Sequence, residues 1–209
     1  MVSEEQAVVR ALRNRRQGAV LAYHGPAGVG KTHAAHDLLR RAGVWAHALS
    51  ATLPLADWPA RFPAGRALPG WIQAALRRLP DGDGALSALA ALIASHAPVG
   101  VIVDDLHDAS PAQAQALTTL AGLLARARGV ALLLTTRHAV PGDLPAYEIC
   151  PLDEAGTAAL CATELGPHLP PEVCHWVHAR AHGNPLFTLE YLRFLVRSGH
   201  LYSCLLYTS

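Results

Sequence analysis

The sequence has almost no net charge, because 17 Lys and Arg residues are balanced by 16 Asp and Glu residues over 209 positions. This balance offers no electrostatic attraction to nucleic acid or to an anionic membrane, and it speaks against a DNA motor without excluding one. Long hydrophobic runs are also missing, since none reaches the roughly 18 residues of a membrane span. The polar start of the chain, Met1-Val2-Ser3-Glu4-Glu5, lacks the apolar core of a signal peptide. We therefore expect no membrane partner.

Cysteine is scarce too. The four residues are widely spaced and form no C-x-x-C pair: Cys150, Cys161, Cys174 and Cys204. Such usage is typical of a reduced, cytoplasmic protein rather than of a disulfide scaffold. Hydrophobic residues make up 51% of the chain, which is enough for one good-sized core with or without a small appendage.

What the sequence does contain is one glycine-rich loop of the pattern G-x-x-x-x-G-K-T. Its residues are Gly25, Pro26, Ala27, Gly28, Val29, Gly30, Lys31 and Thr32. An apolar run precedes the loop and a helical pattern follows it, so that the loop N–H groups and the helix N-terminus would face one anion. The pattern predicts a triphosphate site in which Lys31 reaches the β- and γ-phosphates and the Thr32 hydroxyl binds Mg²⁺. His33, which follows directly, is a further candidate contact to the nucleotide.

Two carboxylates follow a second apolar run, Val101-Ile102-Val103. A buried parallel strand delivers such groups to the sheet edge at which α/β proteins bind their ligands. We assign Asp104 to the metal, directly or through water. Asp105 is the candidate that orients or deprotonates the attacking water.

A third polar group ends the next apolar run. Thr136 and Arg137 follow 130–134, and their hydroxyl and guanidinium groups are candidates to sense the γ-phosphate, with Arg137 neutralising charge in the transferred group. A polar strand end with a solvated arginine remains the alternative.

Apolar runs alternate with helical patterns, which predicts an α/β fold with a parallel sheet. Strands are expected at 19–23, 44–49, 99–103, 130–134 and 147–150. Helices are expected at 4–16, 32–42, 71–79, 86–96 and 111–126, and then, as a small lid, at 153–165, 171–182 and 185–199. Residues 51–70 are rich in proline and are predicted to be a connection, held down by single aromatic residues such as Trp58, Phe62 and Trp71.

With these pieces, the chain resembles the STAND branch of the AAA+-related P-loop ATPases, and within it the ATPase module of maltose-activator and LuxR-tailed bacterial transcriptional regulators. The resemblance covers about residues 1–202. The residues that carry it are 25–32, Val103-Asp104-Asp105-Leu106-His107, Thr135-Thr136-Arg137 and Gly183-Asn184-Pro185-Leu186-Phe187.

The resemblance implies a three-layer P-loop NTPase fold with a five-stranded sheet in the order 5-1-4-3-2. Its core would span 1–152, and a helical lid at 153–202 would close over ADP or ATP with Pro185 near the adenine. Nucleotide exchange and slow hydrolysis would then switch an effector domain attached C-terminal to this fragment, without direct nucleic-acid binding by the domain itself.

The chain departs from the family pattern at two places. The usual Gly-Arg-Glu motif before the first helix is absent, and Asp108 stands where a tryptophan is usual. Only nine residues separate Arg137 from Tyr147, which leaves no room for the helix that presents an arginine finger in ring-forming AAA+ machines. We therefore expect Arg137 to act in cis.

His175, His178 and His182 share one expected helix face, which is more typical of a partly exposed lid surface than of a zinc site. Residues 203–209 resemble a translated sequencing adapter and are excluded from the fold. Two other function classes stay open, namely a nucleic-acid-loading AAA+ ATPase of the replication-initiator kind and a small-molecule P-loop kinase.

Overall fold

The computed structural model describes residues 4–14, 17–62, 69–79, 84–139, 144–167 and 169–201. The predicted adapter scar at 203–209 lies outside these residues. The chain forms two compact units. The first unit comprises residues 1–24 and 31–148, and the second comprises residues 25–30 and 149–209.

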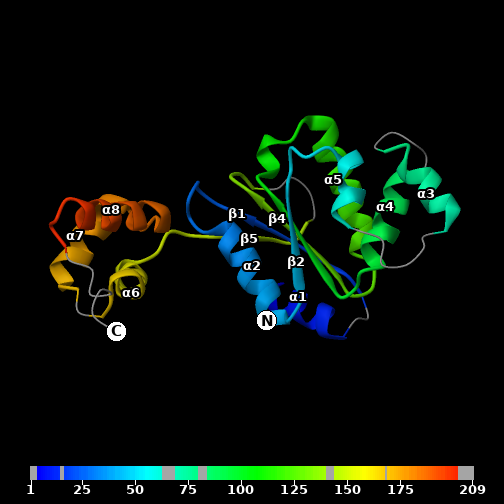
Figure 1. Ribbon diagram of the computed structural model, residues 1–209. Coiled ribbons are helices and arrows are strands. Elements are labelled where there is room, and N and C mark those ends of the chain that lie inside the picture. Colours follow the sequence, from blue (N-terminus) through cyan, green and yellow to red (C-terminus); the bar gives the residue numbers. More distant parts are fainter. Residues whose placement is uncertain are drawn as a thin grey trace, which may run out of the picture. The chain divides into compact units, whose positions relative to one another are not determined.

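The first unit is built on a parallel five-stranded sheet (Figure 1). Its strands are β1 (Ala19–His24), β2 (Trp45–Ser50), β3 (Val99–Asp104), β4 (Val130–Thr136) and β5 (Ala146–Glu148). They pair in the order β2-β3-β4-β1-β5, which is the predicted order 5-1-4-3-2 read from the opposite edge. The prediction of the fold class is therefore confirmed. The central strands β1, β3 and β4 are almost completely buried, as expected for a sheet covered on both faces.

Five α-helices belong to the described part of the first unit. They are α1 (Glu4–Asn14), α2 (Lys31–Ala42), α3 (Gly70–Leu76), α4 (Ala85–Ala94) and α5 (Pro111–Leu124). From β1 the chain runs through α2 to β2 at one edge of the sheet, and it then returns through α4 to β3 and through α5 to β4. Because crossovers between parallel strands are right-handed, α2 lies on one face of the sheet and α4 and α5 lie on the other. Figure 1 shows α1 beside α2 and α4 beside α5.

Side chains of β3 alternate between these two layers. Val99, Val101 and Val103 join the buried core formed with α4 and α5. Gly100 faces the other way, where a Cβ atom would lie only 2.3 Å from Cδ1 of Leu39 on α2. The α2 layer therefore approaches the sheet closely at this point.

The prediction for residues 51–70 was wrong in one respect. The segment contains a 3₁₀ helix, Leu55–Arg61, which begins after Pro54 and includes Pro59. Trp58 and Phe62 are completely buried in the core, so these aromatic residues do hold the segment down. Trp71 does not, since 65% of it is exposed.

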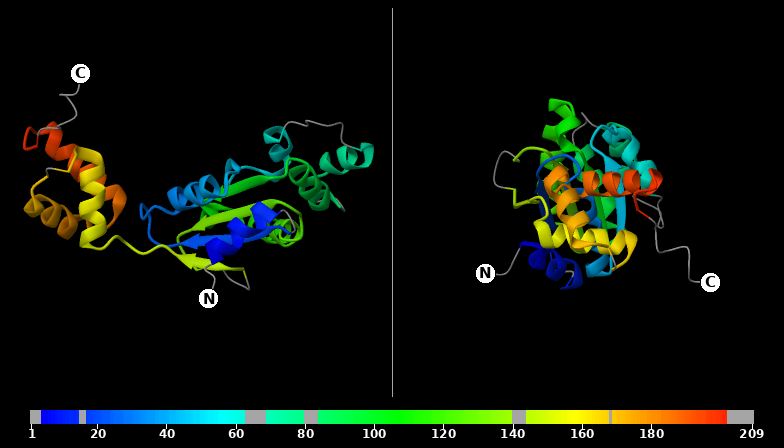
Figure 2. Two further views of the ribbon diagram at one scale, coloured as in Figure 1. Left: turned by 90° about the horizontal axis from the view of Figure 1, so that it is seen from below. Right: turned by 90° about the vertical axis from the view of Figure 1, so that its left-hand side faces the viewer.

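The second unit contains α6 (Glu154–Leu165), α7 (Pro171–Ala181) and α8 (Pro185–Arg197). Figure 2 shows the three helices packed around one another. Their common core holds Cys161, Cys174, Val177 and Leu192. Burial is the main cause that raises the pKa of the Cys161 thiol to about 12, and the neighbouring Cys174 adds to it, so the thiol is protonated at neutral pH. No helix in the described ranges has the length and apolar character to cross a bilayer.

Candidate phosphate and metal site

The polar groups predicted from the ends of two apolar runs lie at one edge of the sheet. Asp104 ends β3 and Thr136 ends β4, and these strands are direct neighbours, with Val103 paired to Leu134. Because both strands are parallel, their carboxyl ends meet at the same edge. The structure thus brings Asp104 next to the end of β4, which Thr136 forms and Arg137 follows.

Thr32 reaches the same edge from the first turn of α2. Its Oγ1 donates to the Asp104 carboxylate, at 2.8 Å from Oδ1 and 3.0 Å from Oδ2. A hydroxyl and a carboxylate within hydrogen-bond distance are the hard oxygen donors that Mg²⁺ prefers. The side chains present therefore fit the metal that the sequence pattern implies.

Thr135 belongs to the Thr135-Thr136-Arg137 motif named from the sequence, but the predicted contact to the nucleotide was assigned to Thr136. Its Oγ1 donates to Asp104 Oδ1 and accepts a hydrogen bond from the backbone N–H of Asp105 at 3.0 Å. The residue is completely buried. The signal that could have found it is its place at a strand end beside Asp104. The neighbouring Thr136, which was predicted instead, is also buried and accepts from the backbone N–H of His138 at 3.5 Å.

Asp105 has an unusual backbone. Its φ of 57° and ψ of 51° lie in the left-handed region, which only a few per cent of residues other than glycine occupy. The residue is exposed and begins the 3₁₀ turn Leu106–Asp108. Its carboxylate lies 3.9 Å from His107 Nδ1, and Asp108 approaches the other ring nitrogen at 3.6 Å. Neither nitrogen has a hydrogen-bond partner among the described residues.

Lys31 is the first residue of α2 and is 93% buried, since its relative exposure is 7%. Burial lowers the pKa of its ammonium group, and the charge of Arg137 lowers it further, while Asp105 and Asp104 act in the opposite direction. Asp104, Asp105 and Arg137 therefore all act electrostatically on Lys31. Arg137 and His33 are both exposed, and the predicted contact of His33 with a nucleotide stays a prediction.

The glycine-rich loop itself, Gly25–Gly30, belongs to the second unit. Its three glycines all have positive φ: 145° at Gly25, 76° at Gly28 and 102° at Gly30. Such conformations let successive N–H groups turn toward one anion. Pro185 occupies the first turn of α8 in the same unit, and its predicted place near the adenine stays a prediction.

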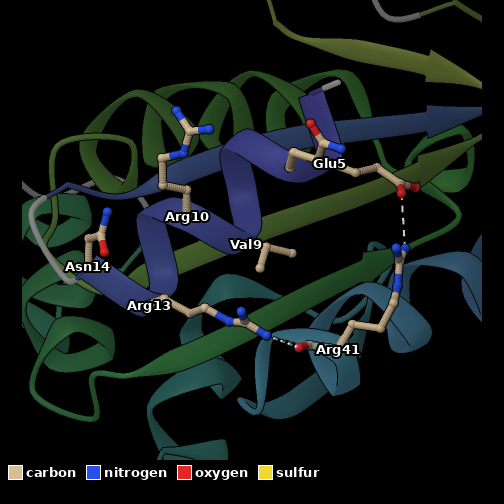
Figure 3. Close-up of a pocket in the computed structure, with 7 residues that line it drawn as sticks. Glu5, Val9, Arg10, Arg13, Asn14 and Arg41 are labelled. Carbon is tan, nitrogen blue, oxygen red and sulfur yellow. Dashed lines mark hydrogen bonds and ion pairs between the residues drawn. The ribbon is translucent and has the colours of Figure 1, made fainter. Parts of the chain in front are cut away.

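A separate groove of about 460 Å³ lies beside α1 and α2 (Figure 3). Its lining residues are Glu5, Gln6, Val9, Arg10, Arg13, Asn14 and Arg41. Arg41 pairs with Glu5 at 2.9 Å and with Asp37 at 2.8 Å, and Arg13 donates to the Arg41 carbonyl at 3.0 Å. The contacts of Arg41 with Glu5 and Arg13 join the two helices, and the pair with Asp37 lies within α2. None of the residues predicted to bind nucleotide lines this groove.

The three histidines of the expected lid face have different surroundings. His175 Nδ1 lies 2.8 Å from Glu154 Oε1, and His178 Nδ1 lies 2.8 Å from Thr157 Oγ1, so both connect α7 to α6. His182 ends α7 with a left-handed φ of 50°. In the part of the chain that the structure describes, no three His, Cys, Asp or Glu side chains are grouped as metal ligands.

No protein-family model and no curated protein matches the chain. Solved structures do. A Signal Transduction ATPase with Numerous Domains (STAND) with a tetratricopeptide repeat sensor, from Pyrococcus horikoshii, matches with a TM-score of 0.55 at 13% identity. That match covers 85% of this chain but only 27% of the STAND protein.

Two RuvB mutants of Thermotoga maritima match with TM-scores of 0.60 and 0.59 at 13% and 14% identity. These matches cover 96% and 94% of this chain, and 66% and 62% of the RuvB chains. The chain thus spans less than two thirds of each of these proteins. At such low identity the likeness bears on the fold, and it agrees with the strand order and with the strand, loop and helix around the G-x-x-x-x-G-K-T motif. The chain has the α/β fold of the P-loop NTPases.

Proposed function

We propose that the chain is a Mg²⁺-dependent ATP-binding domain that hydrolyses ATP slowly and acts as a regulatory switch in a larger cytoplasmic signalling or transcription-regulating protein. The observation that carries the proposal is the hydrogen bond from Thr32 to Asp104, two residues 72 positions apart in the chain. It joins the start of α2 to the end of β3, where metal-bound phosphates are held in this fold.

Each residue then has a distinct task. The loop N–H groups and the Lys31 ammonium hold the phosphates, and Thr32 and Asp104 hold Mg²⁺. The metal, when bound, neutralises charge on the phosphate oxygens. Asp105 orients the attacking water. Arg137 stabilises the charge of the transferred group in cis.

The main alternative is a nucleic-acid-loading AAA+ ATPase. The structural neighbours do not distinguish the two functions, since one is a STAND protein and the others are RuvB. The formal net charge of +1 favours the switch, because a surface that binds nucleic acid nonspecifically needs an excess of Lys and Arg.

The test compares ATP binding by the wild-type chain and by Lys31→Ala, with Mg²⁺ and with EDTA, by isothermal titration calorimetry. Removing a charge-assisted contact to phosphate is expected to weaken binding by roughly 10- to 100-fold. Asp104→Asn is expected to keep ATP binding. In this variant Mg²⁺ is expected to change the ATP affinity much less than in the wild type, and most of the ATP hydrolysis is expected to be lost.

Arg40→Ala is the matched control. It also removes one positive charge from α2, but the Arg40 side chain is 78% exposed and pairs with Asp37. This variant is expected to bind ATP like the wild type. An affinity of Lys31→Ala equal to that of Arg40→Ala contradicts the proposed function.

A further inference from the structure

Within the second unit, the start of α8 contacts the glycine-rich loop. The side chain of Asn184 donates from Nδ2 to the carbonyl oxygen of Ala27 at 2.7 Å. The backbone N–H of Leu186 donates to the carbonyl oxygen of Gly28 at 3.3 Å. Two consecutive loop carbonyls are therefore bound by one short segment of the lid.

Asn184 performs a second task with its other side-chain atom. Its Oδ1 accepts from the backbone N–H groups of Leu186 at 3.1 Å and Phe187 at 3.4 Å, and so caps the N-terminus of α8. The cap determines the orientation of the amide. A flipped side chain would place its NH₂ against helix N–H donors and its oxygen against the Ala27 carbonyl. The contact to the loop therefore needs an amide.

The fit between loop and lid is tight at Gly28. A Cβ atom there would lie 2.8 Å from Asn184 Oδ1 and 2.9 Å from Leu186 Cβ. In a loop whose N–H groups converge on an anion, the carbonyls point to the other side. Under the proposed function, the lid segment thus contacts the side of the loop opposite to the side that would face phosphate.

The segment that holds the loop is itself held. Leu152 donates its N–H to the Gly183 carbonyl at 2.8 Å, and a Cβ atom on Gly183 would lie 2.0 Å from the Leu152 carbonyl oxygen. His182 and Gly183 are consecutive left-handed residues, with φ of 50° and 70°. Asn184 therefore projects from a sharp turn that is bound to the chain before α6.

We propose that Asn184 is a positioning residue that holds the phosphate-binding loop in shape through the Ala27 carbonyl, and so couples the loop to α8. The part of this inference that concerns nucleotide rests on the proposed function. A change of loop shape on nucleotide binding is transmitted to the first turn of α8 through the same side chain.

The variant Asn184→Asp separates the two tasks. Aspartate caps helices as well as asparagine does. It has no donor, and its second oxygen would face the Ala27 carbonyl. The variant is expected to keep α8 and the melting temperature of the second unit, and to lose the contact to the loop.

The first measurement needs no nucleotide. Amide resonances of the isotope-labelled full chain are expected to shift or broaden for Gly25, Gly28 and Gly30 in Asn184→Asp, while those from Thr188 to Arg197 stay in place. The second measurement is ATP affinity, expected to fall roughly 5- to 50-fold, as for a lost hydrogen bond replaced by a repulsive contact. Asn14→Asp, on the exposed end of α1, makes the same chemical change elsewhere and controls for net charge.

Unchanged loop resonances in Asn184→Asp overturn the inference. If the wild type binds no ATP, the proposed function fails, and the resonances alone still decide whether Asn184 positions the loop. If Asn184→Asp does not fold, Asn184→Ser serves in its place, since serine also caps a helix but lacks the amide donor. Loop resonances like those of the wild type in that variant contradict the inference equally.

Discussion

At the scale of single residues, Thr135 organises the candidate site. Its hydroxyl has one proton to donate and gives it to Asp104, while its oxygen accepts from the N–H of Asp105. One buried side chain thus fixes the position of the Asp104 carboxylate, which is expected to hold the metal. It also fixes the backbone of Asp105, the residue expected to orient water. The unusual left-handed backbone of Asp105 is stabilised by this contact.

Replacing Thr135 by valine tests this role. Valine has nearly the same shape, but it leaves the Asp105 N–H without its acceptor and leaves Asp104 with Thr32 as its side-chain donor in place of Thr32 and Thr135 together. A hydrogen bond to a charged group contributes about 1.5–3 kcal/mol, so ATP hydrolysis is expected to fall roughly 10- to 100-fold with ATP affinity within a few-fold of the wild type. Steady-state phosphate release measures the first quantity and calorimetry the second.

Thr135→Ser is the control, because it keeps the hydroxyl and removes only a methyl group. It is expected to retain most of the activity. If valine and serine variants hydrolyse ATP at the same rate, the hydroxyl does not position the carboxylates.

At the scale of secondary-structure elements, the packing of α2 on β3 depends on Gly100. This glycine lies in a central strand, where it has no need of an unusual backbone and instead provides space for Leu39. Leu39 is completely buried, so its side chain has little freedom to move away. Since Thr32 lies on α2 and Asp104 on β3, the same packing sets their distance.

Gly100→Ala is expected to destabilise the chain by about 1–3 kcal/mol, because the added methyl group overfills a closely packed layer. Urea denaturation followed by tryptophan fluorescence measures the loss, since Trp58 is buried in the first unit.

Gly122→Ala is the matched control in the same unit. It lies within α5, and a Cβ atom there meets no atom within 4 Å. Alanine is a better helix former than glycine, so this variant is expected to be more stable by up to about 1 kcal/mol. Equal effects of the two substitutions would mean that the space at Gly100 is not needed.

At the scale of the whole molecule, stability is expected to depend on pH through a histidine at the margin of the core. The His47 ring on β2 packs 4.5 Å from the buried Phe62 ring, and His96 lies 5.8 Å from the same ring. Burial lowers the pKa of His47 below its usual value, and the charge of His96 lowers it further. The neutral imidazole is therefore the form that fits the folded chain.

The unfolded chain, with the usual histidine pKa near 6.5, binds a proton more readily than the folded chain. This contribution to stability is complete above about pH 6.5 and is lost as the pH falls through the lower pKa of the folded state. The urea concentration at the midpoint of unfolding of the first unit is expected to decrease when the pH is lowered from 7.5 to 5.5. The decrease is expected to be smaller in His47→Gln, and an equal decrease in both chains contradicts the assignment to His47.

Local patterns along the chain predicted much of this molecule. The apolar runs that become β1, β3 and β4 mark strands because a buried parallel strand needs apolar side chains on both faces. The glycine-rich motif, Asp104 and Arg137 could be named as candidates for a similar reason, since the expected chemistry requires those residue types beside a strand end, and their roles stay predictions. The 3₁₀ helix at Leu55–Arg61 escaped prediction because its prolines are equally typical of irregular loops.

The sequence by itself determined where the strands and α-helices form, because helix caps, apolar periodicity and turn residues act over a few neighbouring positions. Only the tertiary structure decided which groups meet. Thr135 and Asp104 are 31 positions apart, and Asn184 and Ala27 are 157 positions apart. The contact of Thr135 depends on the register of β4 against β3, because a shift by one residue turns every side chain of a strand to the opposite face. The contact of Asn184 depends on the turn at Gly183, which is shaped by the packing of a distant segment.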